Sequence, residues 1–308
     1  MQKINLEFLS NLFGLDLKEV GNLVTIEELS HLEYKNVSKE EFDKINSDVE
    51  KYIRENDFRV VGENDNKVWE KGWGEILSQV ENGKFHPDIL KPQYFKYKIL
   101  RFNGGYIETD SSAFLYHYDR ILRKIAFYKY LKSSKKIIEL GCGVGNSQFI
   151  LAEMFPNADL TASDWATASQ KIISCISSYL NRPIKGVNFN MLTLEGWENF
   201  EIDNSTSILT VHALEQLGGS ITLLMDKLIA SKPKQCVHIE PIIELYDENN
   251  HYDKLAIEYH KKRNYLSGWL AALRQKEKDG KIKITEVRRL YFGDTYHEAY
   301  SVIVWSPL

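Results

Sequence analysis

The residues best suited to chemistry lie in the stretch IIELGCGVGN, residues 137–146, where glycines recur at every second position after an acidic residue. The glycines are Gly141, Gly143 and Gly145. An apolar run that predicts a strand precedes them, and a run that predicts a helix follows. Glycines allow a tight turn and leave the backbone N–H groups at a helix N-terminus open to a ligand. The stretch therefore predicts a ligand-binding turn.

Two kinds of ligand use such a turn. The dinucleotide pattern G-x-G-x-x-G would need a glycine where Asn146 stands. The pattern present is E-x-G-x-G-x-G, from Glu139 to Gly145, and it resembles the first motif of class I S-adenosylmethionine-dependent methyltransferases. The resemblance implies that Glu139 lies near the methionine portion of the cofactor. It also implies that Gly141, Gly143 and Gly145 line the path of that cofactor.

The ends of the next two predicted strands supply further candidates for cofactor binding. Asp164 ends the run LTASD, and a carboxylate there can accept hydrogen bonds from both hydroxyls of a ribose. The resemblance gives Asp164 that role and makes Trp165 a wall for the adenine. The family often has an acidic residue after the third strand, where this chain has Asn190. Its carbonyl oxygen can accept the same hydrogen bond, and Met191 is the alternative contact.

The acceptor is expected beyond the carboxyl ends of the fourth and fifth strands, as in other open α/β sheets. An alcohol must lose a proton during methyl transfer, so His212 is the first candidate for the catalytic base. Glu240 is the second, and it could orient a hydroxyl or an amine. The alternatives are a His212 bonded to a loop and a Glu240 that caps the turn at Pro241. Glu215 and Glu244 are predicted to contact the substrate.

A single long helix is predicted over residues 251–278. Its polar stripe would hold His260, Arg263, Asn264 and Ser267, which follow one another at helical spacing. His260 and Arg263 are predicted substrate-binding residues, and Arg263 would suit a phosphate or a carboxylate. The alternative is an ordinary solvated helix face.

The elements that must position these residues form an α/β pattern. From Lys136 onward, short apolar strands alternate with helices, which predicts a parallel sheet covered on both faces. The last two strands form a hairpin without a helix between them. We therefore predict a doubly wound, mostly parallel seven-stranded sheet with a C-terminal antiparallel hairpin strand, plus a mainly helical N-terminal cap. The predicted division places the cap or lid in residues 1–111 and the S-adenosylmethionine-binding domain in residues 112–308.

The N-terminal part carries many aromatic residues. Prolines and the Gly104-Gly105 pair predict turns and short extended pieces there rather than a regular sheet. The aromatic side chains predict a lid over the pocket, because their rings bury apolar area yet can carry a polar group. A dimer surface is the alternative, so a homodimer is possible. The residues concerned are Trp69, Trp73, Tyr94, Tyr97 and Tyr106.

Composition narrows the classes of partner and compartment. The formal net charge of −4 disfavours nucleic acid as a ligand. No apolar run approaches the ~20 residues that cross a bilayer, so no membrane span is expected. The N-terminus lacks the features of a secretory signal, and the 3 cysteines have no disulfide or metal spacing. These features predict a cytoplasmic protein.

Other chemistries lack their usual signals. The fourth strand carries no Asn/Asp-Pro-Pro-aromatic motif, and no cysteine stands where a nucleophile for cytosine C5 methylation would. Glu240, Glu244, Asp247 and His251 could supply oxygen and nitrogen ligands, but their spacing matches no known metal pattern, so no metal is predicted.

The sequence thus predicts an enzyme, an S-adenosylmethionine-dependent methyltransferase. The expected acceptor is a hydroxyl, or as second choice an amine, of a small polar molecule such as a sugar or a secondary metabolite. The chain resembles bacterial small-molecule or sugar O-methyltransferases in this respect. Two alternatives stay open: an aminopropyl transferase of the same fold, and a non-catalytic S-adenosylmethionine-binding partner subunit. The intact glycines and Asp164 favour activity.

Overall fold

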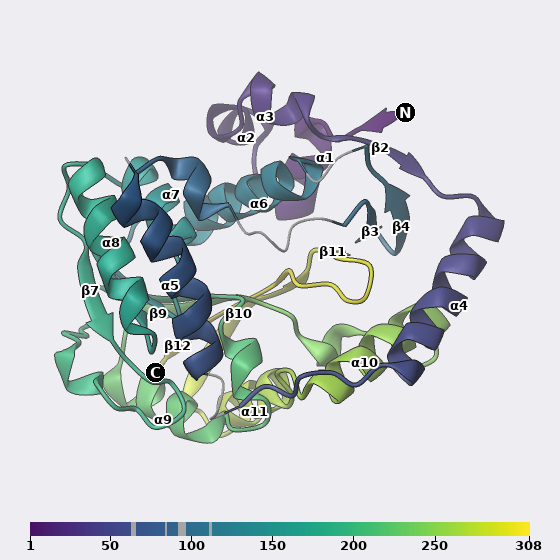
Figure 1. Ribbon diagram of the computed structural model, residues 1–308. Coiled ribbons are helices and arrows are strands. Elements are labelled where there is room, and N and C mark those ends of the chain that lie inside the picture. The colour runs from purple at the N-terminus through teal and green to yellow at the C-terminus, as the bar shows by residue number, and fades with distance from the viewer. Residues whose placement is uncertain (63–65, 84, 92–96, 111–112) are drawn as a thin grey trace.

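The computed structural model describes residues 1–62, 66–83, 85–91, 97–110 and 113–308. Two sheets organise the chain (Figure 1). The larger has the strand order β10-β12-β9-β8-β5-β6-β7, and the smaller has the order β1-β2-β4-β3-β11. Within the described residues no helix combines the length and apolar character needed to span a bilayer.

The larger sheet contains seven strands among the described residues. Strands β5 to β9 run parallel, whereas β12 is antiparallel to both of its neighbours, β9 and β10. The predicted fold class, including the C-terminal antiparallel hairpin strand, is therefore confirmed. The strands are β5 (Lys136–Leu140), β6 (Asp159–Asp164), β7 (Lys185–Asn188), β8 (Thr206–Val211), β9 (Gln235–Glu240), β10 (Ile282–Arg289) and β12 (Ser301–Pro307).

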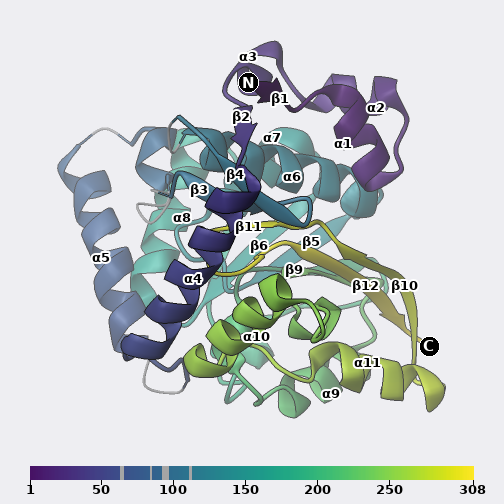
Figure 2. The same ribbon diagram turned by 90° about the vertical axis from the view of Figure 1, so that its right-hand side faces the viewer.

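Helices cover both faces of this sheet because its strands are apolar on both sides. Ile137 belongs to one core and the next residue, Ile138, to the other, as the alternation of side chains along a strand requires. Figure 2 shows α6 and α7 on one side of the sheet and α9 and α11 on the other. The helices are α6 (Ala113–Leu131), α7 (Asn146–Met154), α8 (Thr167–Tyr179), α9 (Thr222–Ser231), α10 (His251–Arg263) and α11 (Trp269–Lys278).

The N-terminal part is mainly helical, as expected, but it also supplies most of the smaller sheet. Capping boxes start α2, α3 and α4, where an N-cap side chain and the Glu at N3 satisfy each other's backbone N–H groups. The elements are α1 (Leu6–Phe13), α2 (Leu17–Leu23), α3 (Ile26–Ser30), α4 (Lys39–Glu55), α5 (Asn66–Asn82), β1 (Gln2–Lys3), β2 (Glu33–Asn36), β3 (Ile99–Phe102) and β4 (Gly105–Glu108).

The expectation of turns without a regular sheet was wrong for residues 99–108. Strands β3 and β4 pair as a hairpin across Asn103 and Gly104, whose φ angles are 49° and 83°. Positive φ at both positions is the requirement of a tight hairpin turn, and Asn-Gly is its strongest sequence signal. Strand β11 (Phe292–Gly293), from near the C-terminus, then pairs with β3.

The single helix predicted over residues 251–278 is also wrong, because it is two helices, α10 and α11. Asn264 ends α10 in the left-handed conformation, with φ 53°, and Gly268 precedes α11 with φ 79°. The Asn264 side chain donates to the carbonyl of Val61, which holds the break in place. Ser267 lies in the link between the helices, so the predicted polar stripe does not exist as one helical face.

The predicted boundary between residues 111 and 112 falls outside the described residues. The proposed division into two parts therefore stays a prediction. Of the aromatic residues predicted to form a lid, Tyr94 also lies outside the described part of the chain.

Candidate active site

The predicted ligand-binding turn joins β5 to α7. Gly141, Gly143 and Gly145 all have positive φ, at 76°, 53° and 84°. A Cβ atom at Gly141 would collide with the Cβ of Ala213, and one at Gly145 would lie 2.6 Å from Cδ1 of Ile176. Backbone conformation therefore favours glycine at both positions, and at Gly141 close packing also leaves no room for a side chain.

A cavity opens beside this turn at the carboxyl ends of β5, β6 and β8, with an empty volume of about 540 Å³. Seven of the predicted site residues line it: Gly141, Gly143, Asp164, Trp165, Asn190, Met191 and His212. The remaining lining residues are Trp69, Trp73, Phe189, Leu192, Ala213, Gln216 and Leu217. Phe189, Leu192 and Ala213 lie next to predicted residues at strand ends. The rule that ligands of open α/β sheets bind at the carboxyl ends of strands would therefore also have indicated them.

Asp164 is almost fully buried and is bonded to the glycine turn. Its Oδ2 accepts the backbone N–H of Gly143 at 2.9 Å, and its Oδ1 accepts that of Ala166 at 2.9 Å. Burial raises the pKa of Asp164 to about 6, although the two backbone donors oppose that rise. Each carboxylate oxygen can accept more than one hydrogen bond, so both stay suited to further donors from a ligand.

The other wall of the cavity follows β7. The Oδ1 atom of Asn190 accepts the backbone N–H of Leu192 at 2.9 Å, which shapes the turn that also carries Met191. The carbonyl of Trp165 accepts from the side chain of Asn188 at 3.0 Å. Adjacent turns after β6 and β7 are thereby tied together at the edge of the cavity.

Glu139 and Gly145 are not among the residues that line the cavity. Glu139 lies buried at the end of β5, where its Oε2 accepts from Nε2 of Gln148 at 2.9 Å. Burial raises the pKa of Glu139 to about 7. Asn146, the residue that separates this turn from the dinucleotide pattern, donates to the carbonyl of Leu90 at 2.7 Å. Its side chain thus links the turn to the N-terminal part.

His212 directly follows β8. Its φ angle is 52°, an unusual backbone conformation for a residue other than glycine. Its ring lies edge-on to Tyr300, with centroids 4.6 Å apart. The Nε2 atom is buried and has no hydrogen-bond partner among the described residues. Burial, followed by the positive charge of Arg123, lowers the pKa of His212 well below its ordinary value. The imidazole is therefore neutral, as a general base must be.

Glu240 ends β9 and is fully buried. Its Oε1 accepts the backbone N–H groups of Ala213 and Leu214, at 3.0 and 3.1 Å, which fixes the loop that follows His212. Burial raises the pKa of Glu240 to about 7. The Oε2 atom has no partner within the described residues.

Glu215 lies on the same loop and accepts from Nε2 of Gln216 at 3.0 Å. Burial, and then the neighbouring Glu240 carboxylate, raise the pKa of Glu215 to about 8. Because Gln216 lines the cavity, Glu215 is one hydrogen bond away from it.

The other predicted substrate-binding residues lie outside the cavity lining. The Oε1 atom of Glu244 accepts the backbone N–H of Leu270 at 3.1 Å, in the first turn of α11. His260 is fully buried, and its Nε2 lies 3.0 Å from Nδ1 of His297. Arg263 ends α10 with its guanidinium 5.0 Å from the ring centre of Tyr265. Their substrate contacts stay predictions.

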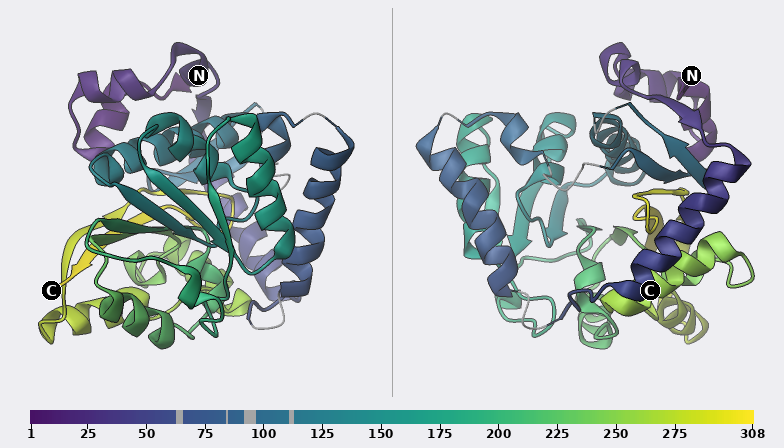
Figure 3. Two further views of the ribbon diagram at one scale, coloured as in Figure 1. Left: turned by 90° about the vertical axis from the view of Figure 1, so that its left-hand side faces the viewer. Right: turned by 45° about the vertical axis from the view of Figure 1, so that its right-hand side comes forward.

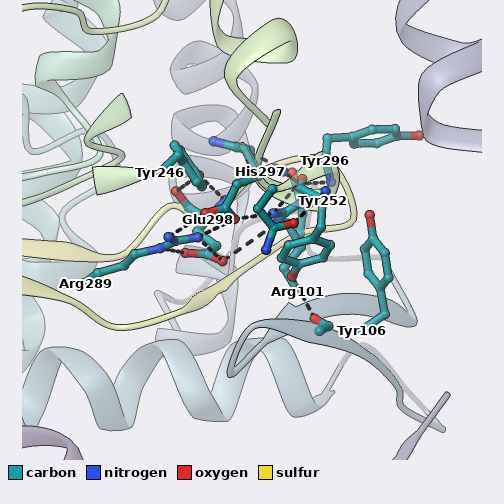
Figure 4. A network of polar contacts seen from close by, with 12 residues as sticks. Arg101, Tyr106, Tyr246, Tyr252, Arg289, Tyr296, His297 and Glu298 are labelled. Atoms are coloured by element: carbon teal, nitrogen blue, oxygen red, sulfur yellow. Dashed lines mark hydrogen bonds and ion pairs between the residues drawn. The ribbon is translucent and has the colours of Figure 1, made fainter. Parts of the chain in front are cut away.

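A buried ion network, which no sequence pattern indicates, adjoins His297 (Figure 4). Arg289 contacts both carboxylates of the network, with hydrogen bonds of 2.6 to 3.0 Å to Asp253 and Glu298. Arg101, with none of its surface exposed, donates to the carbonyl of Tyr252 and lies 3.3 Å from Asp253. These residues are too far apart in sequence for any motif to join them.

Within the described part of the chain, no three His, Cys, Asp or Glu side chains are grouped so that they could hold a metal ion.

No protein-family model matches the chain, and no curated protein matches it. Solved structures resemble it at low identity. The PH0226 protein from Pyrococcus horikoshii OT3 is 11% identical, with a TM-score of 0.46 over 62% of this chain and 91% of its own. The pyocyanin biosynthetic protein PhzM is 14% identical, with a TM-score of 0.46 over 64% of this chain and 58% of its own.

A third is the O-methyltransferase NcsB1 from neocarzinostatin biosynthesis, solved with S-adenosylmethionine and 2-hydroxy-5-methyl naphthoic acid. It is 10% identical, with a TM-score of 0.43 over 63% of this chain and 58% of its own. The present chain thus spans little more than half of NcsB1 and of PhzM. At these identities and TM-scores, the likeness carries nothing about what this chain binds or does.

Proposed function

We propose that this chain is an S-adenosylmethionine-dependent methyltransferase. The observation that carries the proposal is the 2.9 Å hydrogen bond from the N–H of Gly143 to Asp164, at the wall of the cavity. The two sequence features that resemble the family, the glycine turn and the ribose-binding acid, are thereby direct neighbours. They meet at the carboxyl ends of parallel strands, where ligands of open α/β sheets bind.

The cavity suits the proposed cofactor chemically. A Cβ at Gly141 would fill part of the cradle, and two buried polar atoms of the lining, Nε2 of His212 and Oε1 of Gln216, lack partners among the described residues. Such atoms favour a ligand that offers hydrogen bonds, since an unpaired buried polar group costs free energy. When bound, S-adenosylmethionine supplies a methyl group on a positively charged sulfur.

The residues proposed to hold the cofactor divide into two groups. Gly141, Gly143, Asp164 and Trp165 would contact it, with Asn190 and Met191 beside the adenine, as the sequence analysis predicts. Glu139 and Gly145 would support the turn from behind.

The acceptor is proposed to be a hydroxyl of a small polar molecule, such as a sugar or a secondary metabolite, with an amine as second choice. The neutral imidazole of His212 would take the proton that the hydroxyl loses. Glu240 would keep His212 in place, because it binds the two backbone N–H groups that follow. Glu215 lies near enough to the cavity to orient a polar acceptor through Gln216. The apolar and aromatic lining would exclude water.

Calorimetric titration with S-adenosylmethionine and with S-adenosylhomocysteine tests the proposal. We expect wild type to bind both and Asp164→Ala to bind at least about tenfold more weakly, because hydrogen bonds to a charged group are lost. Asp159→Ala is the matched control: Asp159 begins the same strand, is exposed and lies away from the cavity. The proposal is wrong if wild type gives no binding heat, or if Asp164→Ala binds as tightly as wild type.

A further inference from the structure

Helix α5 lies along α8 (Figures 1 and 3). It carries two tryptophans that line the cavity. Trp69 and Trp73 stack on each other, with ring centroids 5.1 Å apart and planes inclined by 27°. Both line the cavity, and Trp73 packs on the glycine turn, since a Cβ at Gly143 would lie 3.2 Å from its Cζ2. The Nε1 atom of Trp69 is buried without a partner among the described residues.

Glu70, between the two tryptophans, ties α5 to the first turn of α8. Its carboxylate accepts the backbone N–H groups of Thr167, at 2.6 Å, and Ala168, at 3.1 Å. The N-cap residue of α8 is Ala166, whose side chain cannot accept these bonds. A carboxylate is favoured at this position because it satisfies free N–H groups and meets the positive end of the helix dipole.

The same short segment also holds Asp164. The N–H of Ala166 donates to Asp164, and the N–H groups of the next two residues donate to Glu70. The proposed ribose-binding carboxylate and the anchor of the tryptophan pair are therefore set by one continuous turn.

We propose that Trp69 and Trp73 form a wall of the methyl-donor site and that Glu70 is the positioning residue that holds this wall on the site. The inference rests on the proposed function. Stacked indole rings suit either charged or flat parts of the donor: a sulfonium is a cation that an aromatic face attracts, and a purine is flat and can stack. The unpartnered Nε1 of Trp69 adds a hydrogen-bond donor to the wall.

A purely structural role for the N-terminal end of α5 does not explain why Glu70 binds the start of α8. Ile76 and Leu77 already bury the following turns of α5 in the main core, alongside Ile172 and Ile173 of α8. That packing anchors the helix without Glu70, and Trp73 adds to it by packing against the same core. The carboxylate fixes the end of α5 that meets the donor site.

The test is the dissociation constant of S-adenosylhomocysteine, measured by calorimetry on the full chain, together with the melting temperature of each donor-free variant. We expect Glu70→Ala and Trp73→Ala each to weaken binding by about tenfold. Glu70→Gln, which keeps an acceptor oxygen, should recover part of the loss. Glu75→Ala is the matched control, because Glu75 is exposed on the same helix and should bind like wild type.

A double variant separates positioning from general destabilisation. If Glu70 acts through Trp73, the effects of the two substitutions on binding do not add. The double variant Glu70→Ala/Trp73→Ala then binds S-adenosylhomocysteine as tightly as the single variant with the lower affinity. Additive losses, or a lower melting temperature in Glu70→Ala with unchanged binding, overturn the positioning role. If Glu70→Ala does not fold, Trp73→Ala decides alone, and wild-type affinity in it overturns the wall.

The two proposals fail differently. Absence of binding in wild type overturns the proposed function and this inference together. If wild type binds S-adenosylhomocysteine and all of these variants bind it equally well, the inference is overturned and the proposed function stands.

Discussion

Single residues around the cavity are placed by backbone N–H groups more than by other side chains. Asp164 accepts two such groups, Glu240 accepts two, and Glu70 accepts two. Each carboxylate thus fixes a turn at a strand end or a helix start, where backbone donors have no partner within their own element. His212 differs, because it lines the cavity and its Nε2 atom has no partner in the described structure.

Replacing His212, the proposed base, should slow the chemical step. We expect His212→Gln to lower kcat by about 10²- to 10⁴-fold, the usual worth of general base catalysis, once the acceptor is known. His251→Gln is the control, since His251 is exposed at the start of α10. Steady-state kinetics with S-adenosylhomocysteine release as the readout checks this. Equal kcat in wild type and His212→Gln would exclude His212 as the base.

At the scale of elements, the loop after β8 contacts both the end of β9 and the break between α10 and α11. Glu240, at the end of β9, holds the loop after β8, and Gly218 of that loop lies against Asn264 at the break between α10 and α11. The break therefore contacts the loop that carries Gln216 and Leu217 of the cavity lining. A continuous helix over residues 251–278 would not place a left-handed residue there.

The buried carboxyl group of Glu240 makes the stability of the fold depend on pH, with a definite sign. Burial raises the pKa of Glu240 from its ordinary value to about 7, so the folded state holds this proton more tightly than the unfolded state. Its contribution to stability is fully present below about pH 4.3, the ordinary range of Glu, and is lost as pH rises through about 7. Glu240→Gln lacks this loss and keeps an acceptor oxygen.

We therefore expect Glu240→Gln to gain stability relative to wild type as pH rises from 5 to 8. Urea unfolding of the donor-free protein at both pH values measures the difference. Glu201→Gln, at an exposed position, serves as the control and should track wild type. A constant difference between Glu240→Gln and wild type, or one of opposite sign, would contradict the raised pKa.

Over the whole molecule, the two sheets are joined by the buried ion network of Figure 4. Arg101 belongs to β3 of the smaller sheet, Asp253 to α10, Arg289 to β10 of the larger sheet, and Glu298 to the segment before β12. Two arginines and two carboxylates balance in charge. The N-terminal part is thus fixed to the larger sheet by buried charge as well as by apolar packing.

Removal of one member should be costly, because it leaves buried charge without its partner. We expect Arg289→Met to lower the free energy of unfolding by about 3–5 kcal/mol. Arg54→Met, which breaks an exposed pair with Glu55, should change it by no more than about 1 kcal/mol. Chemical denaturation measures both. A loss in Arg289→Met as small as in Arg54→Met would show that the network contributes specificity of packing and little stability.

The sequence by itself determined the features that are local in the chain. The glycine turn, the acid at the end of β6 and the alternation of strands with helices all depend on near neighbours. Their spacing predicted the larger sheet, and the resemblance to a known family implied most of the seven predicted site residues that line the cavity. Asn103-Gly104 and Asn264 also carry local turn signals, but the longer patterns around them favoured the wrong structure.

Tertiary structure alone decided which distant segments meet. Glu70 reaches the start of α8, Glu240 reaches the loop after β8, and Arg101 reaches Asp253. Each pairing depends on long-range packing of elements, which no spacing in the sequence encodes. The glycine turn could be predicted from its own residues, and aromatic content placed Trp69 and Trp73 over the pocket, whereas the contact of Glu70 with the start of α8 required the fold.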